Sequence, residues 1–387
     1  MTNRDGFSAL IPAGKISGPS LGRRAFLGGL AAAGAAATLA ACGGGGGSSS
    51  SSQGTGRLGV YGWADYDSPD LVAQFTKETG IPFSLDVYSS NEEAIAKLSA
   101  AKGTAGYDLY MPTGVYIPQQ AQAGLLEELD LARIPNFKNL DSSYVNQPFD
   151  PGNKYSVCKD WGSTGFLYDT TVIKRDLRTW DDFVDAMQNE ASKRTSIIDA
   201  PNELAGLYAW RAAVKQDWTS TDPAFLDGVE KFILDQVAPH VAAYDSYPGS
   251  SVEQGKYALM MAWNGNARLG LVAAKDPARY KWVLGAPTTE LWMDNWAIPT
   301  GAPNPDASHK WINWILEPDH SYTDMKYHGY NTGIKGVAER AEKENLPFRD
   351  MIIFDNAQRQ TMQVGALNEA TERLVQILNK AKAVSAS

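Results

Sequence analysis

The stretch LGVYGWADYDSPDLVAQFTKETG, residues 58–80, decides the predicted fold class of this chain. Its first five residues form a short apolar strand candidate, and Ser68 before a proline is typical of a helix start. The predicted helix turns Leu71 and Phe75 toward a core and ends at Gly80. A strand followed by a capped helix is the repeating unit of α/β folds.

The same alternation continues along the chain. Residues 83–87 alternate apolar and polar side chains, which predicts a half-buried strand. Ser90 and Glu93 have the spacing of a capping box at the start of the next helix. Residues 107–111 form another apolar strand candidate. This rhythm predicts an α/β lobe with parallel strands.

The middle of the chain carries the same signals and predicts a second lobe. Thr179 marks one helix start, and either Thr221 or Asp222 marks another. Asn304 before a proline opens a later helix. A length of 387 residues suits two lobes better than one core. The last predicted helix has an apolar stripe at helical spacing, formed by Leu367, Ala370, Leu374, Ile377, Leu378 and Ala381.

Residues 1–41 are predicted to be a secretory signal. The basic pair Arg23 and Arg24 precedes an Ala-rich apolar run that ends in small residues. This run is too short, and too rich in Ala and Gly, to predict a transmembrane helix. The arginine pair with the following Phe26 and Leu27 resembles a twin-arginine signal, and an ordinary export signal is the alternative.

The segment Leu39-Ala40-Ala41-Cys42 resembles a bacterial lipobox, in which the cysteine becomes the lipid-carrying mature N-terminus. The alternative is a cysteine in a discarded signal tail. Residues 42–56 are mostly Gly and Ser and predict a flexible tether. We therefore expect a folded body from residue 57 onward, held by lipid on Cys42 at the periplasmic or cell-surface side of the cytoplasmic membrane.

Composition and motifs narrow the possible functions. The net charge of −9 argues against nucleic acid and against an anionic membrane surface as partners. With Cys42 used for lipid, Cys158 is a lone thiol that we expect to be buried. We find no zinc-ligand spacing, and no Walker, nucleophile-elbow or dinucleotide motif. We therefore expect no metal, no cofactor and no enzymatic activity.

Aromatic residues next to turns and acids indicate a site for a cationic ligand. The chain has 11 Trp and 17 Tyr. Aromatic faces attract an alkyl ammonium and cover its stem, and a carboxylate neutralises the buried charge. Asp294 between Trp292 and Trp296 is the strongest candidate acid. Similar clusters surround Trp63, Trp161 and Trp263.

Several short segments are distinctive in their order and spacing: residues 61–66, 75–81, 107–109, 148–151, 161–164, 261–265, 292–294 and 329–330. Taken together, they resemble the spermidine/putrescine-binding proteins of bacterial ABC importers. The resemblance covers most of the body, from about Leu58 to the last helix. It implies a two-lobed periplasmic-binding-protein fold of type II, with a ligand cleft between lobes joined by hinge strands. The implied lobes are 57–160 with 293–335, and 161–292 with 336–387.

The resemblance also implies the residues of the site. Asp294 matches the main ammonium-binding acid, and Glu203 matches an acid that meets a further amine. Trp263 and Trp292 match stacking residues. The complete implied set is Trp63, Tyr66, Thr113, Glu203, Ser246, Trp263, Trp292, Asp294 and Tyr330.

Two positions depart from the family pattern. Ala200 stands where the family tends to place a second acid, and Asp199 is one residue away. Val115 stands where the family has a Tyr. The departures at Ala200 and Val115 favour a polyamine with fewer amines, or another amine-bearing solute. The glutamine that the family has near its C-terminus falls near Gln360.

The sequence thus predicts a monomeric lipoprotein that captures a small cationic solute, a polyamine, for ABC permease subunits. The alternatives are a ligand-sensing lipoprotein that docks a receptor, an importer component for another amine-bearing organic solute, and an exported enzyme.

Overall fold

The computed structural model describes residues 56–386. The predicted export signal, Cys42 and all but the last residue of the predicted tether lie outside the described residues. Within the described part of the chain, no helix is both long enough and apolar enough to cross a bilayer.

Ten strands form one mixed sheet in the described residues, in the order β2-β1-β3-β9-β4-β7-β5-β6, with β8 paired to β4 and β10 to β9. Strands β1, β2 and β3 are parallel to one another, and so are β5, β6 and β7. The strands are β1 Leu58–Trp63, β2 Phe83–Tyr88, β3 Leu109–Tyr110, β4 Ser156–Asp169, β5 Thr195–Ile198, β6 Val241–Asp245, β7 Leu259–Trp263, β8 Tyr280–Val283, β9 Thr289–Ala297 and β10 Met362–Val364.

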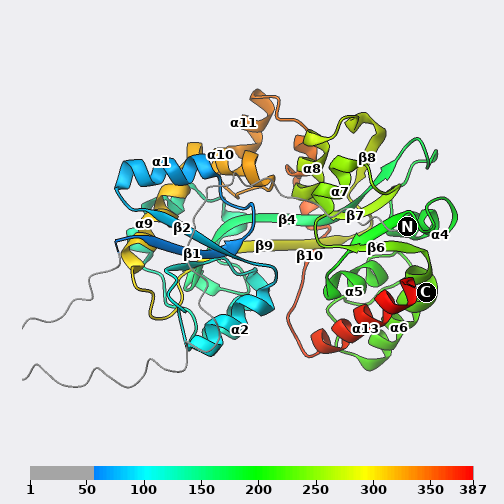
Figure 1. The fold of residues 1–387 in the computed structure, drawn as a ribbon, viewed down its shortest axis with the longest axis horizontal. Helices are drawn as coiled ribbons and strands as arrows, with labels where there is room; N and C mark the ends of the chain where they lie inside the picture. The colour runs from blue at the N-terminus through cyan, green and yellow to red at the C-terminus, as the bar shows by residue number, and fades with distance from the viewer. Residues whose placement is uncertain (1–55, 387) are drawn as a thin grey trace, which may run out of the picture. The chain divides into compact units, whose positions relative to one another are not determined.

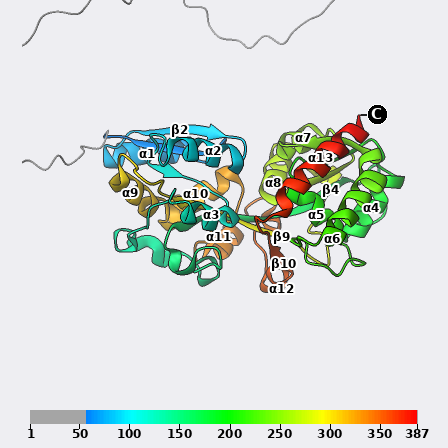
Figure 2. The same ribbon diagram turned by 90° about the horizontal axis from the view of Figure 1, so that it is seen from below.

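Strands β4 and β9 run antiparallel and join the two halves of the sheet (Figure 1; Figure 2). The first part of β4 pairs with β9, from Ser156 opposite Ala297 to Ser163 opposite Leu291. From Thr164 onward β4 pairs with β7 instead. The predicted lobe boundaries at 160/161 and 292/293 therefore fall inside these two strands.

Helices cover both faces of the first half, where α1 and α2 lie on opposite sides of β1 and β2 (Figure 1). The Ser68 side chain caps α1, and Gly80 ends it with φ of 71°, in the left-handed region that favours glycine. Both predicted caps are confirmed. The helices here are α1 Pro69–Thr79, α2 Asn91–Ala101, α3 Ile117–Gln122, α9 Pro305–Ile315, α10 Pro318–His328 and α11 Val337–Lys343.

The second half has the same layered construction. Thr179 forms a capping box with Asp182, and Asp222 rather than Thr221 caps the helix that follows it. The apolar stripe of the last helix is buried as predicted, although Leu367 precedes that helix. The helices are α4 Trp180–Asn189, α5 Pro201–Ala209, α6 Pro223–Phe232, α7 Pro248–Gln254, α8 Asn264–Ala273, α12 Asn356–Gln360 and α13 Ala370–Ser385.

Two predictions in the first half need correction. Val87 was expected to face the core but its side chain is 53% exposed, because β2 is the edge strand of the sheet. The strand predicted over 107–111 has ladder pairing only at Leu109 and Tyr110. Cys158 is a free buried thiol, as predicted. The fold class, a two-lobed α/β architecture built on crossing strands, is confirmed.

Candidate ligand-binding site

One face of the crossing strands β4 and β9 collects acids and aromatic rings. Side chains two residues apart on a strand share a face, so Glu290, Trp292 and Asp294 of β9 point to the same side. Asp160 of β4 lies opposite Asp294, and Gly162 lies opposite Trp292. Strand β9 thus places the acid Glu290, the ring of Trp292 and the acid Asp294 one after another on a single face.

Asp294 forms the centre of the first acidic cluster. Its side chain is buried, and its Oδ1 accepts a hydrogen bond of 2.6 Å from the Thr113 hydroxyl. Its Oδ2 lies 2.9 Å from the Tyr66 hydroxyl, which also lies 2.7 Å from Oδ1 of Asp160. Two loops and two strands that are distant in sequence therefore meet at this cluster.

The Tyr66 hydroxyl has one proton for two carboxyl oxygens, so the second short contact needs a proton from a carboxyl group. Burial raises the pKa of Asp294 to about 6. Burial also raises the pKa of Asp160 well above its usual range, and the nearby charge of Asp294 adds to this. The ligand-free cluster therefore holds a proton near neutral pH.

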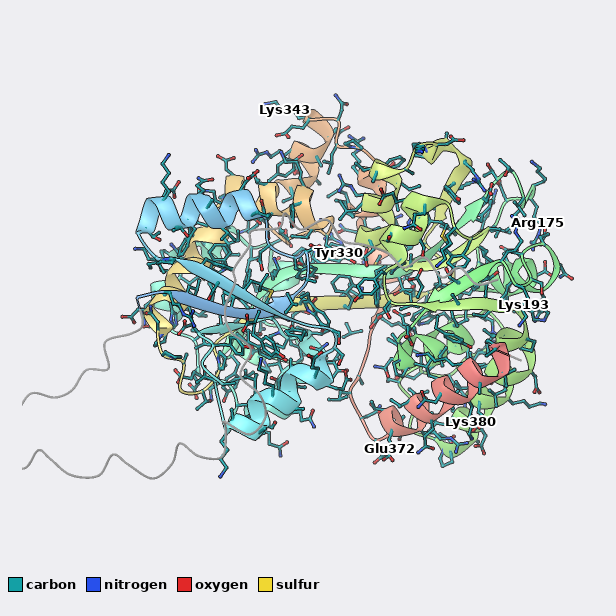
Figure 3. The ribbon with its side chains drawn as sticks, viewed as in Figure 1. Arg175, Lys193, Tyr330, Lys343, Glu372 and Lys380 are labelled. Carbon is teal, nitrogen blue, oxygen red and sulfur yellow. The ribbon has the colours of Figure 1, made fainter. Side chains whose placement is uncertain are left out.

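Aromatic rings pack beside this cluster. Trp292 lies over Gly162, where an added Cβ would come within 2.3 Å of the indole. Tyr330 packs edge-on against Trp292 with ring centroids 4.8 Å apart, and it also contacts Tyr66 at 6.1 Å. Figure 3 shows Tyr330 beside β4, where this strand crosses between the halves.

Glu203 forms the centre of a second acidic cluster. It lies in the first turn of α5 and is 3% exposed. Its Oε1 accepts hydrogen bonds from the Thr164 hydroxyl at 2.7 Å and from Nε1 of Trp263 at 3.1 Å. Its Oε2 is buried and has no partner among the N–H groups and alcohol or phenol hydroxyls of the described residues.

The carboxyl group of Glu290 reaches the same cluster from β9 and hydrogen-bonds to that of Glu203. Burial raises the pKa of Glu203 to about 7. Burial and the charge of Glu203 raise the pKa of Glu290 well above its usual range. These two carboxyl groups therefore share a proton in the absence of another cation.

A buried lysine lies beneath the first cluster, but other acids neutralise it. Lys159 Nζ lies 3.3 Å from Asp67 and 3.0 Å from Asp324, and all three side chains are almost completely buried. Burial alone would raise the pKa of Asp324, but the neighbouring Lys159 and His328 hold it well below its usual range. This group fastens β4 to α10 and to the loop after β1.

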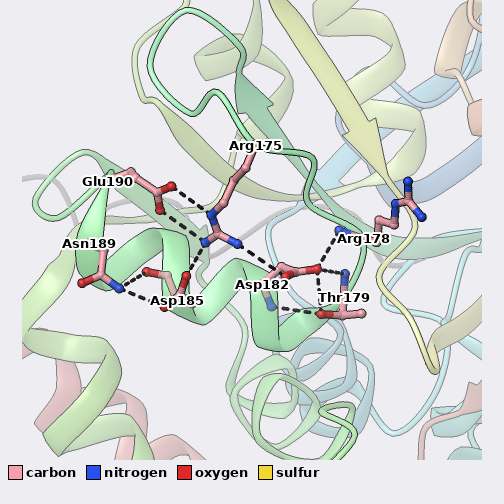
Figure 4. A network of polar contacts seen from close by, with 7 residues as sticks. All are labelled: Arg175, Arg178, Thr179, Asp182, Asp185, Asn189 and Glu190. Carbon is pink, nitrogen blue, oxygen red and sulfur yellow. Dashed lines mark hydrogen bonds and ion pairs between the residues drawn. The ribbon is translucent and has the colours of Figure 1, made fainter.

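The acids of a surface network provide a contrast. Arg175 contacts the carboxylates of Asp182, Asp185 and Glu190 beside α4 (Figure 4). In the part of the chain that the structure describes, no Lys or Arg lies within 4 Å of the carboxylates of Asp294, Glu203 or Glu290. The two clusters on the crossing strands are therefore short of positive charge.

The structure brings eight of the nine predicted residues onto or next to this face. Trp63 ends β1 and packs against Tyr88, with ring centroids 4.5 Å apart. Ser246 is the exception, because it is exposed and its hydroxyl contacts Asp199 at 3.5 Å. Asp199 in turn pairs with Lys382 at 2.6 Å, so it is not free to replace the acid missing at Ala200.

Two acids of this face were missed by sequence reasoning. Asp160 directly precedes Trp161 in the sequence, but only the β4–β9 register places it opposite Asp294. Glu290 is four residues before Asp294, a spacing that keeps both on one face of a strand.

A surface cavity of about 730 Å³ beside β10 includes Arg211 and Lys215 and none of the nine predicted residues.

Known proteins share both the sequence pattern and the fold. A family model described as bacterial extracellular solute-binding protein matches residues 70–348. The spermidine/putrescine-binding periplasmic protein of Salmonella typhimurium is 33% identical over 276 residues, which cover 71% of this chain and 77% of that protein. A protein of Haemophilus influenzae named spermidine/putrescine-binding periplasmic protein 1 is 31% identical over 66% of this chain and 69% of its own length.

Solved structures extend the similarity to the whole described body. The spermidine/putrescine ABC transporter substrate-binding protein PotD of Streptococcus pneumoniae superposes with a TM-score of 0.70 at 26% identity, covering 86% of this chain and all of that one. The TpPotD lipoprotein of Treponema pallidum has the same fold, with a TM-score of 0.72 at 23% identity over 84% of this chain and 99% of that one. The chain belongs to the bacterial extracellular solute-binding protein family.

Proposed function

We propose that this protein captures a polyamine outside the cytoplasm and delivers it to an ABC importer. The observation that carries the proposal is the pair of buried acidic clusters, one at Asp294 and one at Glu203, with Trp292 on the strand face between them. A polyamine has ammonium groups separated by apolar methylenes, and this order of acids and rings matches that pattern.

The energetics favour a cationic occupant. A buried carboxylate without a cation or enough donors costs several kcal/mol, about 3–5 when one member of a buried pair is removed. Each cluster lowers this cost by holding a proton, because burial raises the pKa values of Asp160 and Glu290 well above their usual range and also raises those of their partners Asp294 and Glu203. An ammonium group that enters the site replaces those protons and neutralises the carboxylates.

Strands β4 and β9 act as a hinge between two lobes, which close on the ligand as in other periplasmic binding proteins. One lobe comprises residues 57–160 and 293–335, and the other comprises residues 161–292 and 336–387. The protein acts as a monomer, tethered by lipid on Cys42, and presents its ligand to permease subunits. The proposal assigns no reaction to the site.

A thermal-shift series on the soluble body, residues 57–387, tests the proposal. Putrescine and spermidine are expected to raise the melting temperature, because a ligand at a hundredfold excess over its Kd adds about 2.7 kcal/mol of stability. A neutral sugar is expected to have no effect. A shift with sugar and none with either amine would contradict the proposal.

The variant Asp294→Asn makes the test specific. It should weaken amine binding by about 2–5 kcal/mol, because it removes one partner of a desolvated charge pair. Asp350→Asn is a matched control, since the Asp350 side chain is 96% exposed and contacts Arg349 at the surface. Equal affinities in the two variants would remove Asp294 from the site.

A further inference from the structure

We propose that Glu290 is a ligand-binding residue that, together with Glu203, holds one terminal ammonium group of a bound amine while Asp294 holds another. This inference rests on the proposed function, because it assumes that the occupant of the site is a polyamine. It assigns a role to a residue that the resemblance to known proteins did not indicate.

The segment before α5 lacks an acid that the family pattern places there. The family pattern expects a carboxylate at position 200, and this chain has Ala200 there. Its neighbour Asp199 pairs with Lys382 at 2.6 Å and contacts Ser246. Neither residue of that segment therefore offers a free carboxylate beside Glu203.

Glu290 supplies a carboxyl group at that place from a different element. It lies on β9, is partly buried, and meets the carboxyl group of Glu203 from α5. The Ser163 hydroxyl donates to the Glu290 backbone carbonyl at 2.6 Å, which holds the strand at this position. The charged groups that face the Glu290 carboxyl are Glu203 and, farther along β9, Asp294; both are acids.

The second cluster has room for donors that the protein does not provide. Oε1 of Glu203 accepts from Thr164 and Trp263, whereas its buried Oε2 has no N–H or alcohol donor in the described part of the chain and meets only the carboxyl group of Glu290. A primary ammonium group has three N–H donors and needs several acceptors when it is buried. Oε2 of Glu203 and the carboxylate of Glu290 provide such acceptors.

The spacing of the clusters indicates the class of ligand. Glu290 and Asp294 are four residues apart on β9, which places their Cα atoms about 13 Å apart along the strand. The ring of Trp292 lies on the same face between them. The site therefore suits an amine with ammonium groups at both ends of its chain, and a triamine such as spermidine spans this distance better than a four-carbon diamine.

Binding at this second cluster has a consequence for protons. Glu203 and Glu290 share a proton when no ligand is bound, and an incoming ammonium group takes the place of that proton. Binding of spermidine near neutral pH is therefore expected to release protons into the buffer. Replacing Glu290 by Gln removes one of the two carboxyl groups and should reduce this release.

Isothermal titration calorimetry of spermidine with the soluble body tests the inference. The Glu290→Gln variant should bind spermidine at least about tenfold more weakly, which corresponds to loss of one charge-assisted hydrogen bond. Titrations in two buffers of different ionisation enthalpy should show less proton release than in the wild type. Glu290→Asp, which keeps the charge on a shorter stem, should recover part of the affinity.

The matched control is Glu253→Gln, which changes an exposed acid of α7 and should leave affinity and proton release unchanged. Circular dichroism of each variant verifies that it is folded. Wild-type spermidine affinity in Glu290→Gln would overturn this inference and leave the proposed function standing. Failure of the wild-type protein to bind any amine would overturn the proposed function and this inference with it.

Discussion

The hydroxyl group of Tyr66 lies 2.9 Å from Oδ2 of Asp294, and this contact joins the loop after β1 to a strand that crosses between the two halves of the sheet. The two residues are 228 positions apart in the sequence. The same hydroxyl contacts Asp160 of the other crossing strand. The Tyr66 side chain is therefore the point at which both hinge strands and the first half of the molecule meet.

Tyr66→Phe tests this contact directly. Removal of the hydroxyl leaves Asp160 and Asp294 without their shared donor, so we expect amine binding to weaken by about 1–3 kcal/mol. Calorimetry with spermidine measures the change. Tyr247→Phe is the control, because Tyr247 is 71% exposed. Unchanged affinity in Tyr66→Phe would show that the hydroxyl does not orient the binding carboxylates.

Trp263→Ala tests the aromatic component. We expect a loss of about 1–3 kcal/mol of binding free energy, since both apolar cover and the cation–π attraction disappear. The indole also donates to Glu203, so Trp263→Phe should lose less than the alanine variant. Spermidine titration of both variants measures the order. Wild-type affinity in the alanine variant would place Trp263 in the core rather than in the site.

The raised pKa of Glu203 predicts an unusual pH dependence of stability. A carboxyl group whose pKa is about 7 in the folded chain binds its proton more tightly there than when unfolded. Its contribution to the free energy of unfolding therefore falls as pH rises from about 5 to about 8. This is opposite in sign to the effect of a salt-bridged acid such as Asp324, whose pKa is lowered.

Urea denaturation of ligand-free wild type and Glu203→Gln at pH 5, 6, 7 and 8 measures this effect. The variant should be more stable relative to wild type at pH 8 than at pH 5, by about 1–3 kcal/mol. The comparison cancels the opposing contribution of His328, whose pKa burial lowers. Parallel stability curves for the two proteins would show that Glu203 does not hold a proton near neutral pH.

Lys159→Met tests the buried ion group below the site. The change leaves Asp67 and Asp324 buried without their cation, so we expect a destabilisation of about 3–5 kcal/mol. Thermal and urea denaturation measure it. Lys154→Met is the control, because Lys154 forms a half-exposed pair with Glu128. Equal stability of the two variants would mean that the Lys159 group does not hold β4 in place.

The sequence alone determined the local elements and indicated several candidate site residues. Ser68 and Thr179 cap their helices because their side chains bond to backbone N–H groups three residues away, which is a local property. Asp294 was identified from its neighbours Trp292 and Trp296. Of these two rings, Trp292 lines the site, whereas Trp296 is 1% exposed and packs against Trp311.

Tertiary structure alone decided which acids act together. Asp160 and Asp294 are opposite each other only through the antiparallel register of β4 and β9, and Glu203 meets Glu290 only because α5 packs beside those strands. Pairings across such distances depend on sheet register and on the packing of whole elements, which one-dimensional spacing does not encode. The same packing buries the acids, and burial is what raises their pKa values and leaves them short of positive charge.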